Sequence, residues 1–117
     1  MTHREIPIQV TAWVDEGVAD LVVALNAIPG ILTLDSCQEG PDGRARVTFC
    51  THERAMLREA MDHLGAIIHG QPWQEHVALM LWAGRDDERP VADITCRPQW
   101  VTPLARVVRA SASRKTQ

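Results

Sequence analysis

Residues able to do chemistry gather in one short stretch, LDSCQEGPDGR, at positions 34–44. Cys37 is its candidate nucleophile, because a cysteine attacks electrophiles as a thiolate. A thiolate needs a base or a positive charge nearby, and a histidine brought close by the fold could supply it. Asp35 and Glu39 flank Cys37, however, and negative charges disfavour a second anion between them. We therefore expect Cys37 to have a structural or ligand-lining role rather than a catalytic one.

The sequence contains no clear motif for a metal site or for a phosphate-binding loop. The chain holds three cysteines and five histidines, but none has the C-x-x-C or H-E-x-x-H spacing typical of zinc sites. We expect no metal site. The turn EGPDG supplies backbone N–H groups without forming a phosphate-binding loop, and Asp15, Glu16, Glu39 and Asp42 would repel an anion. A ligand with amino, guanidino or nucleobase donors fits this region better.

Length and composition predict a single domain. The chain has 117 residues, of which 45% are hydrophobic and 23% are charged, as in ordinary globular proteins. No apolar run is long enough for a membrane span, and no signal-peptide pattern opens the chain. An odd number of widely spaced cysteines argues against a disulfide framework and favours a reducing compartment. We therefore expect a cytoplasmic protein without membrane association.

The net charge of −3 hides an uneven distribution. Four of the twelve Lys and Arg residues lie in the last dozen residues, which contain no Asp or Glu. The rest of the chain is therefore strongly acidic. Because nucleic acid is held mainly through its phosphates, we expect nucleic acid not to be a partner.

Hydrophobic periodicity predicts alternating strands and helices. Residues Ile6–Val14 alternate with a period of two, as in a half-buried strand. Asp15 then follows as a candidate N-cap for a helix that ends at Pro29 and Gly30. The segments ILTLDS and ARVTF read as two strands joined by a turn, and a second helix runs from the region of Thr51 to Gly70.

The remaining third of the chain predicts two more strands and a helix. HVALMLWAG, which begins at His76, is apolar on both faces, so we expect a buried strand. VADITC could pair with it. A short helix follows over Leu104–Ala110. We therefore expect one domain over residues 1–110 and a basic, disordered tail over 111–117.

The order β-α-β-β-α-β predicts an α+β fold, a ferredoxin-like sandwich with an additional C-terminal strand and short helix. In this topology the two helices cover one face of the sheet. The other face is solvated, forms a homodimer, or is covered by the C-terminal helix, and Met80 and Trp82 would favour the last two. One end of the sheet collects the candidate ligand-binding residues, which are Asp15, Ser36, Cys37, Gln38, Glu39, Arg44, His69 and His76.

The segment VDEGVADLVVALNAIPGILTLDSC, residues 14–37, resembles the opening segment of the wybutosine-synthesis tRNA methyltransferase family. It shares the Val-Asp-Glu start, the Leu-x-Asn positions and the Ser-Cys ending. The resemblance implies that Asp15 and Ser36 belong to an active site and that S-adenosylmethionine is the methyl donor. The family continues after its cysteine with Ser-Gly-Arg, whereas this chain has Gln38-Glu39-Gly40. The topology is also similar to that of ACT-type domains, which bind amino acids.

Three functions remain open from the sequence. The leading hypothesis is a non-catalytic domain that binds a small amino-acid-like or nucleotide-like ligand at the 36–44 loop and the first helix's N-terminus. The second is an S-adenosylmethionine-dependent RNA methyltransferase-like enzyme, with Asp15 and Ser36 as its catalytic residues. The third is a protein-interaction or inhibitor module that uses the open sheet face through Trp13, Arg46 and Trp82.

Overall fold

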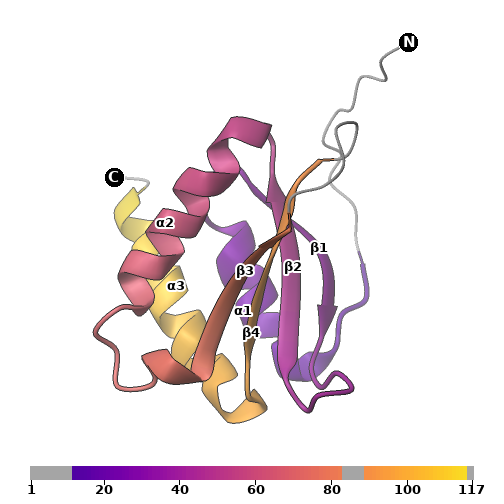
Figure 1. Cartoon of the computed structure of the whole chain (residues 1–117). Helices are drawn as coiled ribbons and strands as arrows, with labels where there is room; N and C mark the ends of the chain where they lie inside the picture. The colour runs from indigo at the N-terminus through magenta and orange to yellow at the C-terminus, as the bar shows by residue number, and fades with distance from the viewer. Residues whose placement is uncertain (1–11, 83–88, 116–117) are drawn as a thin grey trace.

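Helices cover one face of a four-stranded sheet in the computed structural model, which describes residues 12–82 and 89–115 (Figure 1). The elements follow one another as α1 (Glu16–Asn26), β1 (Ile31–Cys37), β2 (Ala45–Thr51), α2 (Leu57–Ile68), β3 (Val77–Trp82), β4 (Val91–Cys96) and α3 (Val101–Lys115). The predicted α+β class is therefore confirmed. The predicted strand Ile6–Val14 lies mostly outside the described residues, and its last three residues have no regular structure.

The sheet is antiparallel throughout and has the order β1-β2-β4-β3. The last strand in the sequence therefore lies inside the sheet, between β2 and β3, and the predicted pairing of the last two strands is confirmed. Ile94 of β4 stands opposite Val47 on one side and Leu79 on the other. The outer strands of the described sheet are β1 and β3.

The hydrophobic core lies between the sheet and the helices. Val47, Phe49 and Ile94 are completely buried on the helix-facing side of the sheet. Leu25 of α1 and Leu104 of α3 are completely buried above them. Helix α3 packs against both α1 and α2, so it belongs to the helical layer. Of the three alternatives for the open sheet face, cover by the C-terminal helix is therefore wrong.

Helix α3 is longer than the sequence suggested, because it begins at Val101 and continues to Lys115. Pro103 lies in its first turn, where a missing backbone N–H does no harm. The sequence placed a disordered tail from residue 111, yet Ser111 and Ala112 are buried. The Ser111 hydroxyl contacts His63 of α2 and donates to the Val108 carbonyl. These contacts explain why the helix continues; residues 116–117 lie outside the described residues.

Strand β3 differs most from its prediction. Its apolar sequence predicted a strand buried on both faces, but β3 is an outer strand of the sheet that the described residues form. Met80, Leu81 and Trp82 are 49%, 51% and 53% exposed. Periodicity cannot reveal this difference, since an apolar run has the same pattern in the middle of a sheet and at its edge. Among the described residues, no helix is long and apolar enough to cross a membrane.

Candidate functional site

Asp15 and Gln38 hold the start of α1 against the end of β1. The backbone N–H of Gln38 donates to Asp15 Oδ2 at 3.1 Å, and the backbone N–H of Gly17 donates to Gln38 Oε1 at 2.8 Å. Gln38 therefore satisfies a helix N-terminal donor, a role that the sequence assigned to Asp15, which makes no such side-chain cap. The two predicted residues do meet, but they use their polar groups on the backbone.

Ser36 and Cys37 lie on opposite faces of β1. Ser36 stands opposite the buried Val47, and Cys37 stands opposite Arg46. Because successive side chains of a strand alternate between its faces, the two cannot line the same pocket. The Ser36 backbone N–H donates to the carboxylate of Asp35 at 2.9 Å. Neither the predicted joint binding role nor the predicted Ser36 catalysis gains support from this arrangement.

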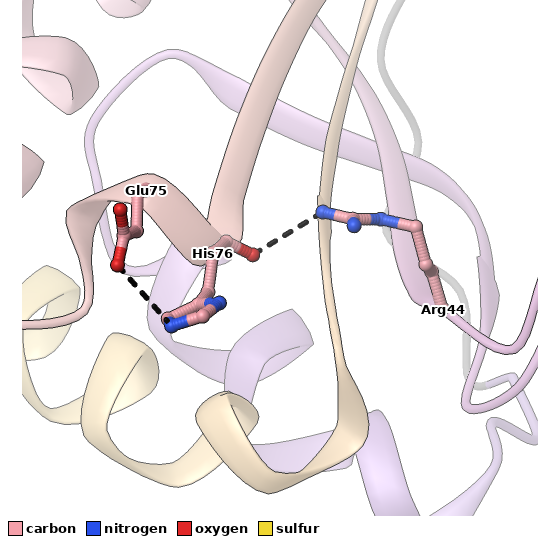
Figure 2. A network of polar contacts seen from close by, with 3 residues as sticks. All are labelled: Arg44, Glu75 and His76. Carbon is pink, nitrogen blue, oxygen red and sulfur yellow. Dashed lines mark hydrogen bonds and ion pairs between the residues drawn. The ribbon is translucent and has the colours of Figure 1, made fainter.

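Arg44, directly before β2, contacts β4 and the residue directly before β3 at one end of the sheet. Its Nη2 donates to the carbonyl oxygens of His76 at 3.2 Å and Thr95 at 3.4 Å. The first of these contacts appears in Figure 2, where His76 also lies 3.7 Å from a Glu75 carboxylate oxygen. The His76 ring stacks on Trp100, with the ring centroids 5.0 Å apart. Arg44 and His76 thus lie together, and the Arg44 guanidinium binds a backbone carbonyl of His76 rather than its ring.

Cys96 lies near the Arg44 guanidinium and is completely buried. Burial raises the pKa of its thiol from 9.0 to about 11, and the nearby positive charge of Arg44 only partly opposes this effect. The thiol therefore stays protonated at neutral pH, which disfavours a nucleophilic or metal-binding role for Cys96. The indole N–H of neighbouring Trp100 is buried without a hydrogen-bond partner in the described part of the chain.

The other predicted residues stand apart from these contacts. His69 follows α2 as an exposed residue, and Glu39 is exposed in the turn after β1. Neither side chain makes a hydrogen bond or an ion pair within residues 12–82 and 89–115. No group of three or more His, Cys, Asp or Glu side chains within these ranges is arranged to hold a metal ion.

Sequence reasoning missed a polar network on the open face of the sheet. Asp93 of β4 is only 9% exposed, although it lies on the face away from the helices. Its carboxylate accepts hydrogen bonds from the Thr48 hydroxyl and from the Trp82 indole N–H, the latter at 2.7 Å. The network fixes the end of β3 to the two central strands. Register was the missing signal, because these three residues are far apart in the sequence.

A second missed feature is a surface hollow of about 370 Å³ between α1 and α3. Its lining residues are Asp20, Thr102, Ala105, Arg106, Arg109 and Ala110. The spacing of Thr102, Arg106 and Arg109 along a helix could have indicated it. That signal was hidden because the predicted helix was short and the arginines were counted as part of a basic C-terminal region.

Comparison with known proteins gives no family for this chain: no family model, no curated protein and no solved structure matches it.

Proposed function

We propose that this protein is an interaction module that forms a homodimer by pairing its β3 strand with β3 of a second copy. The observation that carries the proposal is the outer edge of β3, which no other strand of the described residues covers. Its sequence is VALMLW, without a charge, a proline or a glycine. Long, regular and apolar edge strands are templates for pairing with another chain.

The opposite edge of the sheet, formed by β1, is less suited to pairing with a second copy than β3 is. Strand β1 is irregular between Thr33 and Asp35, where its register with β2 shifts. Two of its backbone N–H groups are already used by side chains. Thr33 donates to the Asn26 side chain at 3.2 Å, and Ser36 donates to Asp35. Bulges, charges and occupied donors are the devices that block edge pairing. Strand β3 has none of them in its described residues.

A second copy is the partner that fits this edge. In a two-fold antiparallel pair, opposite side chains lie on the same face of the sheet. A two-fold axis at Met80 therefore places Ala78 opposite Trp82 of the second copy and Leu79 opposite Leu81. Each pair is apolar, and the small Ala78 leaves room for the large indole. No like charges meet, because β3 carries none.

We also propose that the fold is a variant of the ferredoxin-like arrangement. Three features support this relation: an antiparallel sheet, helices on one face, and a helix between β2 and β3. In this variant β4 takes the inner place that the first strand has in the usual βαββαβ order. The C-terminal strand would then replace the predicted Ile6–Val14 strand rather than extend the sheet.

The earlier functional hypotheses have less support. The polar groups of Asp15, Gln38 and Arg44 are used within the fold. A small-ligand site at this end of the sheet stays a prediction, as do S-adenosylmethionine binding and methyl transfer. The residues that the methyltransferase resemblance implies, Asp15 and Ser36, give no sign of a cofactor pocket in their contacts.

Sedimentation equilibrium of the wild type and two lysine variants tests the proposal. Met80→Lys places two like charges opposite each other at the two-fold axis. We therefore expect the dissociation constant of the dimer to rise at least about 100-fold. Leu34→Lys is the matched control, since Leu34 is 55% exposed on the other edge strand, and it should leave the dimer intact. Both variants should remain folded by circular dichroism. A monomeric wild type at all concentrations, or equal effects of the two substitutions, would contradict the proposal.

A further inference from the structure

The hollow is lined by residues of α1 and α3, and both of these helices belong to the helical layer (Figure 1). Asp20 contributes from α1, and the other lining residues come from α3. Its volume of about 370 Å³ lies within the range of small-molecule sites. Ala105 and Ala110 form small side-chain positions, which leave the arginines accessible from the hollow.

The charged groups of the hollow have no partners within the described chain. Arg106 and Arg109 are exposed, and neither makes a hydrogen bond or ion pair among the described residues. The same is true of Asp20. Residues three apart on a helix share a face, so the two guanidinium groups can approach one anionic group together. Guanidinium groups bind carboxylates through paired hydrogen bonds.

We propose that this hollow binds a small molecule that carries a carboxylate beside an ammonium group, as an α-amino acid does. Arg106 and Arg109 bind the carboxylate, and Thr102 offers a hydroxyl beside them. Asp20, across the hollow, binds the ammonium group. A phosphate fits less well. It carries more negative charge than a carboxylate and has no ammonium group to pair with the Asp20 carboxylate.

Titration of the ¹⁵N-labelled protein with α-amino acids, followed by amide chemical shifts, tests this assignment. We expect at least one amino acid to saturate the shifts of Thr102, Ala105 and Ala110 below roughly 10 mM, which is weak but specific binding. The double variant Arg106→Gln, Arg109→Gln should weaken this binding at least about tenfold, because two charge-assisted hydrogen-bond donors are lost. Arg58→Gln, on the exposed side of α2, is the control and should bind as the wild type does.

The variant Asp20→Asn tests whether Asp20 binds the ammonium group of the ligand. The variant should weaken binding of the amino acid and strengthen binding of lactate, which has the carboxylate but carries a hydroxyl in place of the ammonium. Equal changes for both ligands would overturn the assignment of Asp20. Saturation by inorganic phosphate alone, or by no ligand in the series, would overturn the proposal. These outcomes are independent of dimer formation, because Met80→Lys changes only the β3 edge and should keep the same binding.

Discussion

The two outer strands of the sheet, β1 and β3, differ in how their backbones and side chains are used. Polar side chains surround β1: Asn26 bonds Thr33, Asp35 bonds the next residue, and Asp15 bonds Gln38 just after the strand. Strand β3 carries exposed apolar side chains and, within residues 12–82 and 89–115, pairs only with β4. The polar groups that resemble a binding site thus occupy backbone donors beside β1. The apolar groups that resemble a core lie on an open edge.

This contrast changes what each stretch of sequence means. A concentration of Asp, Ser and Gln at the end of a strand is often taken as a sign of a ligand site, but side chains of these types also satisfy backbone groups at strand and helix ends. An apolar run is taken as a sign of burial, yet on an outer strand it indicates a partner. The comparison predicts measurable differences between the β1 side and the β3 side of the sheet.

The largest difference concerns the thiols of Cys96, beside β3 in strand β4, and Cys37 in β1. Folding raises the pKa of Cys96 to about 11 from 9.0, so the folded protein holds this proton more tightly than the unfolded chain does. Its stabilising contribution is complete below pH 9 and is lost as pH rises to about 11. We expect a fall of about 2 kcal/mol in the free energy of unfolding over this range.

Urea unfolding across this pH range measures the effect. Few other groups titrate in this window, because the chain contains no tyrosine and its single lysine is near the C-terminus; substitution separates Cys96 from the two other thiols, Cys37 and Cys50. Cys96→Ala should remove most of the pH dependence, whereas Cys37→Ala should keep it. If Cys96→Ala keeps the full slope, another group causes it.

The next difference concerns two aspartates. Asp93→Ala leaves the Thr48 hydroxyl and the Trp82 indole N–H without their acceptor, so we expect it to destabilise the fold by about 2 kcal/mol. Asp35→Ala removes an exposed carboxylate from β1 and should cost less than about 0.5 kcal/mol. Chemical denaturation measures both costs. Asp93→Ala should also weaken the dimer, because Trp82 loses its anchor; a dimer unchanged by this variant would place Trp82 outside the interface.

Local patterns predicted the elements well, and contacts distant in sequence explain what they missed. The VADITC segment forms β4 over the six predicted residues, because β-branched residues and the flanking proline define it locally. Its place between β2 and β3 depends on strand pairing, which no local pattern encodes. Arg44 and His76 could be brought together by topology alone. The Thr48–Asp93–Trp82 network and the hollow beside Arg106 required the register of the sheet and the packing of α3.

The smallest expected difference is in the stability effects of alanine substitutions at two helical glycines. One of these, Gly17, contacts Gln38 just after β1. A Cβ on Gly17 would lie 2.5 Å from Gln38 Oε1, whereas a Cβ on Gly65 would meet nothing within 4 Å. Gly17→Ala should therefore displace the Gln38 side chain, remove its bond to the start of α1 and destabilise the fold by about 1 kcal/mol. Gly65→Ala should instead stabilise it by about 0.5 kcal/mol, because alanine favours the helix. Thermal unfolding distinguishes the two directions. Neither variant should change the dimer, since neither residue belongs to β3; a Gly17→Ala variant as stable as the wild type would show that Gln38 does not hold α1 against β1.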